Sequence, residues 1–233
     1  MQIEILGTRG EIEPSAPYHS RRSGILIDDE LLLDVGEEEF LKKKPRWIII
    51  THLHPDHAYF VRNKQNFNPG VPVYAPQKSD LVDARILKSE KTIHLGKLRI
   101  TPLPTHHSKT VKSFALIIER GKSIIIYTSD MIWINKEHHH HFENLDLAIT
   151  EASFLRKGGM IRRDDATGRI YGHKGVPDFI DFFKPYTNKI LLVHFGSWFY
   201  KMRARNARKK VKKIASQKDV EVTLGYDGMK ITV

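Results

Sequence analysis

The sequence contains no cysteine among its 233 residues. This absence excludes disulfide scaffolds, thiolate zinc fingers, iron–sulfur clusters and cysteine nucleophiles, so any bound metal must use histidines and carboxylates. No apolar run approaches the ~18 residues that span a bilayer, and the N-terminus lacks the basic and apolar pattern of a leader. We therefore expect no contact with a membrane and a cytoplasmic location.

The chain also lacks internal repeats, low-complexity linkers and any step in composition that marks a domain boundary. Its 40% hydrophobic and 28% charged residues are typical of a globular protein. We therefore expect one domain over residues 1–233.

Short β-rich runs recur along the whole chain. They lie at residues 3–6, 24–27, 31–35, 47–51, 71–74, 98–101, 114–119, 124–128, 145–150, 190–193, 220–224 and 230–233. Turn residues at 28–30 and 120–122 predict two antiparallel hairpins. Helical periodicity is strongest at 77–88, 176–183 and 201–216. Strands combined with helices indicate a layered α/β architecture.

The most specific motif is the run His52-Leu53-His54-Pro55-Asp56-His57, which directly follows the apolar run 47–51. A regular strand or helix cannot direct four such ligands at one ion, whereas a loop at a strand end can direct them toward two neighbouring ions. An exposed polar loop is the alternative interpretation, but this strict spacing after an apolar strand favours a two-metal site.

Other ligand-type residues also follow apolar runs. His106 and His107 come after the run 98–101, Asp130 after 124–128, and His194 after 190–193. A single histidine or aspartate at a strand end is usually a capping or surface residue. The ordered recurrence of such residues after the first motif instead predicts further metal ligands.

In these motifs the sequence resembles the metallo-β-lactamase superfamily, and the resemblance covers nearly the whole chain. It implies a four-layer αββα sandwich and a site for two Zn²⁺ ions, although a His/Asp ligand set also suits Mn²⁺ or iron. The implied ligands are His52, His54 and His106 or His107 for one ion, Asp56, His57 and His194 for the other, and Asp130 between them. The His-Ser pair typical of the family favours His107 over His106.

Paired metal ions lower the pKa of a shared water toward neutrality, so the expected chemistry is hydrolysis by a metal-bound hydroxide. Within the superfamily, the segments around Glu151 and His173 resemble the ribonuclease Z and phosphodiesterase branch. That resemblance implies that His173 contacts the phosphate and protonates the leaving oxygen, that Glu151 orients His173, and that Asp56 assists the attacking water. Taken singly, Glu151 is more often a solvated strand-end carboxylate and His173 a loop histidine, but the two together favour the functional interpretation.

Basic residues exceed acidic ones by 38 to 27, and eight of them lie between residues 201 and 213, where no acid occurs. On a helix, Lys201, Arg205 and Arg208 share one face, which predicts a substrate-binding ridge for a phosphodiester, with RNA as a candidate partner. A solvated helix face is the alternative interpretation.

Two features separate the chain from ribonuclease Z. No Gly/Pro-rich inserted arm is present, and Ala58-Tyr59-Phe60 stands where a glycine pair commonly follows the first motif. A smaller phosphodiesterase therefore fits better than processing of the tRNA 3′ end. The run from His138 to His141 predicts an exposed loop that binds metal adventitiously, with substrate gating as the alternative.

The leading hypothesis is a dinuclear metal-dependent phosphodiesterase or ribonuclease. The first alternative is a metallo-hydrolase of thioesters, lactones or other carboxylic substrates. The second is a nucleic-acid-binding member of the fold without turnover. A homodimer is compatible with the sequence, although no residue pattern specifies one.

Overall fold

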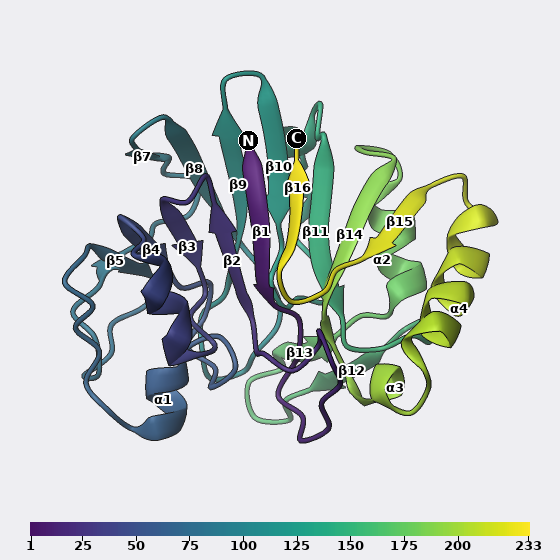
Figure 1. The fold of residues 1–233 in the computed structure, drawn as a ribbon, viewed down its shortest axis with the longest axis horizontal. Helices are drawn as coiled ribbons and strands as arrows, with labels where there is room; N and C mark the ends of the chain where they lie inside the picture. The colour runs from purple at the N-terminus through teal and green to yellow at the C-terminus, as the bar shows by residue number, and fades with distance from the viewer.

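A computed structural model describes residues 1–233. Two seven-stranded sheets lie face to face (Figure 1). The first has the order β16 (Met229–Thr232), β1 (Gln2–Gly7), β2 (Gly24–Ile27), β3 (Leu31–Leu33), β4 (Trp47–Ile49), β5 (Val73–Ala75) and β6 (Arg85–Ile86). The second has the order β15 (Glu221–Leu224), β14 (Lys189–Phe195), β11 (Leu147–Ala152), β10 (Ser123–Tyr127), β9 (Phe114–Arg120), β8 (Leu98–Pro104) and β7 (Ile93–Leu95).

Alternate residues of the buried strands enter two different hydrophobic cores, because successive side chains point to opposite faces of a sheet. Ile125 of β10 and Ile49 of β4 meet in the core between the two sheets. Their neighbours Ile126 and Ile48 instead enter the outer cores, which separate each sheet from its helices. Both isoleucine runs are therefore covered on both faces, as their continuous apolar sequence requires.

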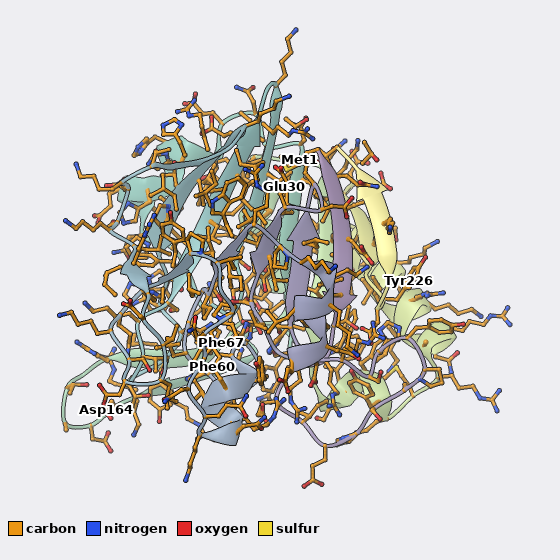
Figure 2. All side chains as sticks on the ribbon, turned by 60° about the vertical axis from the view of Figure 1, so that its left-hand side comes forward. Met1, Glu30, Phe60, Phe67, Asp164 and Tyr226 are labelled. Carbon is orange, nitrogen blue, oxygen red and sulfur yellow. The ribbon has the colours of Figure 1, made fainter.

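Helices cover the outer face of each sheet and complete four layers. The first sheet is covered by η1 (Glu38–Lys43) and α1 (Tyr59–Asn63), and the second by η2 (Lys136–Phe142), α2 (Val176–Phe183), α3 (Ser197–Tyr200) and α4 (Ala204–Ser216). Figure 2 shows Phe60 of α1 beside Phe67, and their stacked rings lie 4.5 Å apart in the outer core. The predicted αββα architecture is thus confirmed. None of the helices is long and apolar enough to cross a membrane.

Both predicted hairpins are present. β2 and β3 pair antiparallel across a turn in which Asp28 and Asp29 have φ of 52° and 56°, and Gly121, with φ of 60°, lies in the turn between β9 and β10. Tight hairpin turns require this left-handed backbone, which aspartate and glycine adopt at the lowest cost.

The prediction of a helix at 77–88 is wrong. The segment forms turns and the short strand β6, which pairs parallel with β5 at the sheet edge. The Leu87 amide donates to the Ala75 carbonyl at 2.9 Å, while the Phe67 amide donates to Leu81. The backbone of this segment is thus bonded to neighbouring chain segments instead of to itself, although its apolar spacing resembles that of a helix.

Two further boundaries differ from expectation. The helix predicted at 201–216 is α4, which begins at Ala204, so Lys201 lies outside it and caps α3. The hairpin of β12 (Met160–Arg163) and β13 (Ile170–His173) was not predicted, because its strands are short and largely polar. Asp164, near the tip of this hairpin, lies at the outer edge of the molecule in Figure 2.

The strands that precede the candidate ligands all end at one edge of the sandwich. β3 and β4 are parallel, as are β10, β11 and β14, and their carboxyl ends meet at the lower edge in Figure 1, beside the β12–β13 hairpin. Residues that are far apart in sequence therefore reach one place. Ligand sites of α/β sheets lie at such carboxyl ends.

Replacing Phe179 of α2 by alanine is expected to lower the free energy of unfolding by about 3–5 kcal/mol, because its ring is fully buried in the outer core. Urea denaturation measures the change. The control is Asp181→Ala on the same helix, where an exposed ion pair with Lys218 contributes less than about 1 kcal/mol. Equal losses in the two variants contradict the assigned packing.

Candidate metal centre

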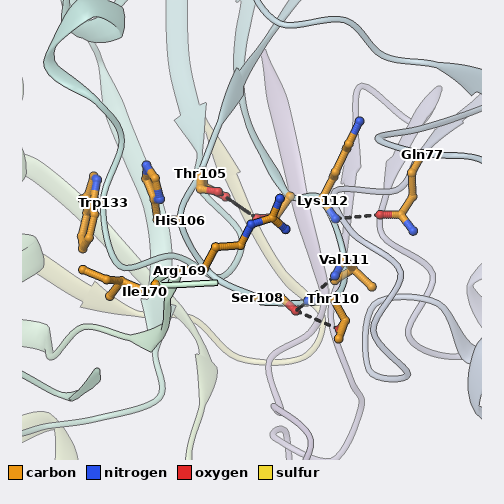
Figure 3. A pocket seen from close by; sticks show the side chains of 12 residues that line it. Gln77, Thr105, His106, Ser108, Thr110, Val111, Lys112, Trp133, Arg169 and Ile170 are labelled. Atoms are coloured by element: carbon orange, nitrogen blue, oxygen red, sulfur yellow. Dashed lines mark hydrogen bonds between the residues drawn. The ribbon is translucent and has the colours of Figure 1, made fainter. Parts of the chain in front are cut away.

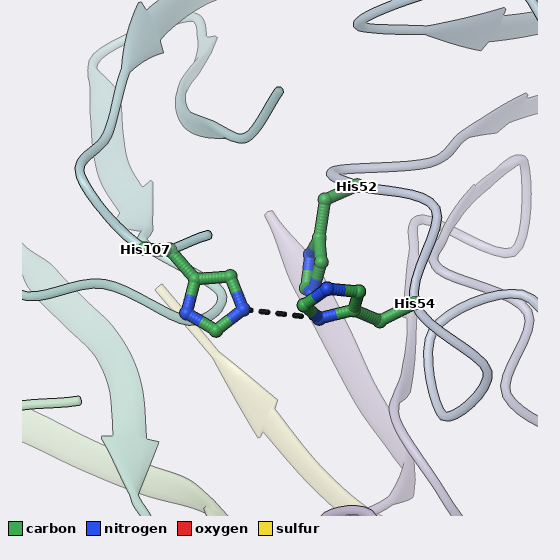
Figure 4. Close-up of side chains that lie close together, drawn as sticks. All are labelled: His52, His54 and His107. Carbon is green, nitrogen blue, oxygen red and sulfur yellow. Dashed lines mark hydrogen bonds between the residues drawn. The ribbon is translucent and has the colours of Figure 1, made fainter. Parts of the chain in front are cut away.

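Three histidines form the first group of the candidate centre. His52 and His54 come from the loop after β4, and His107 comes from the loop after β8. The three ring centroids lie 4.6 to 4.9 Å apart, and His107 Nε2 is 3.1 Å from His54 Nδ1 (Figure 4). Their nitrogens converge as the ligands of one metal ion do.

Asp56, His57 and His194 form the second group. His194 Nε2 donates to Asp56 Oδ2 at 2.8 Å, and the stacked rings of His57 and His194 lie 5.1 Å apart. His194 is the penultimate residue of β14, whereas Asp56 and His57 belong to the loop after β4. The fold therefore joins two distant segments into a second set of nitrogen and oxygen donors.

Asp130, directly after β10, lies between the two groups. Its Oδ2 faces His52 Nε2 at 3.9 Å and His107 Nε2 at 3.7 Å. Its Oδ1 faces His57 Nε2 at 3.5 Å and His194 Nδ1 at 3.4 Å. Each carboxylate oxygen thus points at one of the two groups, which is the arrangement of a bridging ligand.

Some of the donor atoms have no hydrogen-bond partner in the protein, as is expected of atoms that bind a metal. His52 Nε2 and Asp130 Oδ1 are both fully buried, yet neither makes a hydrogen bond. Buried polar atoms are nearly always satisfied, so these two atoms are placed to contact an ion or a water. Burial lowers the pKa of His52 well below 6.5 and that of His107 to about 3. Both imidazoles are therefore neutral, the form in which histidine binds metal.

The structure brings His107 into the cluster and leaves His106 outside it. The side chains of successive residues in an extended segment point in opposite directions. His107 Nδ1 contacts the Gly172 carbonyl at 3.1 Å, which leaves Nε2 to face the cluster. The His106 ring lies beside Trp133, and its Nε2 donates to Asn135 Oδ1 at 3.0 Å (Figure 3).

Asp34 supports the cluster from beneath, and the sequence reasoning missed it. Its fully buried carboxylate accepts hydrogen bonds from His57 Nδ1 at 2.9 Å, from the Tyr127 hydroxyl at 2.8 Å and from the Thr51 amide at 2.7 Å. It thereby fixes which nitrogen of His57 faces the second group. An aspartate directly after an apolar strand was the available signal, the same one that identified Asp130.

Three residues of the centre adopt a backbone that side chains avoid. Asp34, Ser129 and His194 have φ of 58°, 52° and 51°. Each such residue costs about 1–3 kcal/mol and persists only where the surroundings hold it. Glycine would relieve the strain, but it would remove the carboxylate, the hydroxyl or the imidazole. The strain therefore indicates that the side chains are needed at these strand ends.

Glu151 and His173 form an ion pair beside the cluster. His173 Nδ1 donates to Glu151 Oε2 at 2.8 Å, and the Met131 amide donates to Glu151 Oε1 at 2.8 Å. Burial opposes the charge on His173, but the carboxylate of Glu151 outweighs it and raises the pKa of His173 to about 9. The two residues, which come from β11 and β13, thus form a buried proton-holding pair.

A cavity of about 300 Å³ opens onto the centre. It is lined by His54, Asp56, His107, Asp130, His173 and His194 among others. Lys201, Arg205 and Arg208 do not line it. The helix α4, which carries Arg205 and Arg208, packs Ala207 and Val211 in the outer core. Substrate binding by Lys201, Arg205 and Arg208 stays a prediction.

The histidine run is not the exposed loop that the sequence predicts. It lies in the 3-10 helix η2, where His138 is buried and donates from Nδ1 to Glu90 at 3.0 Å. His139 stacks on Phe142 with ring centroids 5.1 Å apart. Phe142, at the end of η2, packs in the outer core and holds the helix against the second sheet. His140 is exposed, and the ligand atoms of Glu90, His140 and His141 lie within 4.8 Å of one another, so adventitious metal binding by this run stays a prediction.

The family model of the beta-lactamase superfamily domain matches residues 40–195. The chain belongs to the beta-lactamase superfamily. The matched range contains all seven residues of the two groups and their bridge. No curated protein matches the sequence.

Solved structures of this superfamily share the fold at low sequence identity. The metallo-beta-lactamase fold protein YhfI from Bacillus subtilis has a TM-score of 0.72 and 22% identity, over 99% of this chain and 98% of that one. A diphosphatase of the PhnP family has a TM-score of 0.69 and 15% sequence identity, over 100% of this chain and 97% of that one. Human tRNase Z, short form, has a TM-score of 0.62 and 18% sequence identity, over 100% of this chain and 99% of that one. The fold and the His/Asp cluster are those of a metallo-β-lactamase fold hydrolase.

His107→Ala is expected to reduce the bound metal, because it removes a donor atom from the first group. His106→Ala, at the adjacent position, is expected to retain the metal content of the unmodified protein. Elemental analysis of the purified variants after dialysis against metal measures both. The reverse result would assign the ligand to His106.

Asp34→Ala is expected to weaken metal affinity by about 10–100-fold, because His57 loses the group that orients it. Competition with a chromogenic chelator measures the affinity. Asp34→Asn retains an acceptor oxygen, is isosteric and should lose less. Affinities equal to that of the unmodified protein in both variants contradict the supporting role.

Proposed function

We propose that this protein is a dinuclear metal-dependent phosphodiesterase, with zinc as its metal and single-stranded RNA among its substrates. The observation that carries the proposal is the ion pair of His173 and Glu151, in which His173 lines the same cavity as Asp56, Asp130 and His194, and Glu151 is buried behind it. Hydrolysis of an unactivated phosphodiester needs a proton donor for the leaving oxygen. His173 is that donor in the proposal.

The contacts of His173 suit this role. Glu151 accepts the hydrogen bond from Nδ1, so Nε2 is the nitrogen available to a substrate in the cavity. As the bond between phosphorus and the leaving oxygen breaks, the proton on His173 Nε2 passes to that oxygen. Glu151 stays ionised, holds the ring and stabilises its charge before the transfer.

The metal ions, when bound by His52, His54, His107, Asp56, His57, His194 and Asp130, supply Lewis acidity toward the phosphate and lower the pKa of water. Asp56 lines the cavity beside His173, where its carboxylate can accept a hydrogen bond from the attacking water. Asp56 thus provides a hydrogen-bond acceptor for the attacking water, and His173 provides a proton donor for the leaving oxygen. Both side chains line the cavity that would hold the substrate.

The charge around the cavity favours an anionic substrate. Six basic and two acidic residues lie between 156 and 174, the segment that carries the β12–β13 hairpin and His173. Glu11, a carboxylate of the cavity wall outside the ligand groups, is paired with Arg22 at 3.4 Å. The negative charge of a phosphodiester is attracted by this basic hairpin, whereas the reacting group of a thioester or a lactone is uncharged.

Two of the compared structures have names that support this reaction class. They are the diphosphatase of the PhnP family and human tRNase Z. Because their identities to this chain are 15% and 18%, the likeness concerns the fold, and the choice of substrate rests on the residues described above.

His173→Ala is expected to lower kcat about 10²–10⁴-fold for a dinucleotide, whose leaving oxygen needs a proton. The loss should be smaller for a nitrophenyl diester, whose leaving group departs as a stable anion. Steady-state kinetics with both esters and a thioester measure these effects, and elemental analysis checks that the metal remains. His94→Ala, an exposed histidine of β7, is the control.

A thioester that is cleaved faster than either phosphodiester contradicts the proposed function. An equal loss for both phosphodiesters in His173→Ala contradicts the assignment of His173 as the proton donor, even if the protein proves to be a phosphodiesterase.

A further inference from the structure

A second and larger cavity lies next to the metal centre. Its volume is about 670 Å³, and it is lined by residues of four segments: Gln77, the loop 105–113, Trp133, and the part of the β12–β13 hairpin at 168–170. The chain at 105–108 forms the wall between this cavity and the cluster. His107 points from that wall to the metal ligands, and His106 points from it to the cavity.

One side of the cavity is an aromatic pair, His106 and Trp133. Their ring centroids lie 4.6 Å apart with 31° between the planes. Asn135 Oδ1 accepts from His106 Nε2 at 3.0 Å and from Trp133 Nε1 at 3.2 Å. The Ile132 amide also donates to the His106 carbonyl. The rings are therefore held in place while remaining half-exposed, which is the property of a stacking surface for a base.

The other side of the cavity is cationic. Arg169 and Lys112 line it, and no carboxylate does. Figure 3 shows the Arg169 side chain, from the position just before β13, extending into the space between the aromatic pair and Lys112. The one hydrogen bond of this guanidinium is at the distance limit, 3.5 Å from Nη1 to the Lys109 carbonyl. Most of its donors thus remain free for an anion.

Hydroxyl groups complete the lining. Thr105, Ser108, Thr110 and Ser113 all contribute to it. Ser108 Oγ accepts from the amides of Thr110 and Val111 at 3.2 and 3.3 Å, so the loop is ordered by its own hydrogen bonds. A guanidinium beside hydroxyls is the donor set that recognises phosphate oxygens.

We propose that this cavity binds one nucleotide unit, with its base against the His106–Trp133 pair and its phosphate on Arg169 and Lys112. The proposal rests on the proposed phosphodiesterase function in that the nucleotide belongs to the strand that is cleaved. β13 connects the two places, because Ile170 lines this cavity and His173 lines the metal cavity. Three residues of a strand span roughly 10 Å, a distance that neighbouring units of a nucleic-acid strand can bridge.

The test measures binding to the metal-loaded protein under conditions that slow cleavage. Fluorescence anisotropy follows the binding of a short labelled oligoadenylate with phosphorothioate linkages, which keep the negative charge. His106→Ala is expected to weaken binding about 5- to 100-fold, the range for one stacked base. His106→Phe keeps an aromatic ring and should restore most of the affinity.

Arg169→Ala is expected to weaken binding about tenfold and to reduce its dependence on salt concentration, because one phosphate contact is lost. The matched control is Arg99→Ala, near the opposite end of β8, which removes the same charge outside the cavity. Adenosine monophosphate should compete with the oligoadenylate in the unmodified protein, whereas inorganic phosphate should compete far more weakly.

Several results overturn the proposal. They are unchanged binding in His106→Ala, equal losses in Arg99→Ala and Arg169→Ala, and equal competition by phosphate and adenosine monophosphate. Adenosine monophosphate that binds without displacing the oligoadenylate shows a free nucleotide site and overturns the assignment to the substrate strand. Hydrolysis of a nitrophenyl diester by the metal-loaded protein tests the proposed function separately, so the two failures are distinguishable.

Discussion

The gathering of two carboxylates and five imidazoles at one edge of the sandwich, six of them buried and His54 half-buried, is the constraint on which the rest of the site depends. Removing these groups from water is unfavourable unless each finds a hydrogen bond or a charge partner. Asp130 provides part of that compensation, since each of its oxygens faces two histidines. The remaining orphan atoms, His52 Nε2 and Asp130 Oδ1, are compensated only when a cation is present. Metal binding and the stability of this edge are therefore coupled.

The same constraint explains the strained backbone and the support around the ligands. The strand ends must stop in register, so Asp34, Ser129 and His194 turn through left-handed conformations to direct their side chains inward. The two hydrophobic layers on either side of the second sheet supply the rigidity that holds them there. The hairpin of β12 and β13 lies beside this rigid ligand set, and its side chains reach both cavities. In the proposed function the hairpin contacts the substrate, while the ligand set holds the metal.

Much of the fold was predictable, because alternation of apolar residues and turn chemistry act locally. The isoleucine runs of β4 and β10 and the aspartates at the turn after β2 specify strands and a hairpin without reference to the rest of the chain. The segment 77–88 was not predictable in this way. Its apolar spacing suits a helix, but hydrogen bonds to β5 and to Phe67 make it part of a sheet edge. Such bonds depend on neighbours that are distant in sequence.

The sequence by itself determined the ligand types and their order, because the absence of cysteine leaves histidine and aspartate, and the motif at residues 52–57 places four of them after one strand. Tertiary structure decided three other matters. It selected His107 over His106, because the two side chains point to opposite sides of an extended segment and only His107 faces the cluster. It also placed Asp34 in contact with His57. It also put Arg169, and not the helix that contains Arg205, beside a cavity next to the centre. The reason is that side-chain direction and proximity arise only when separate strands pack together.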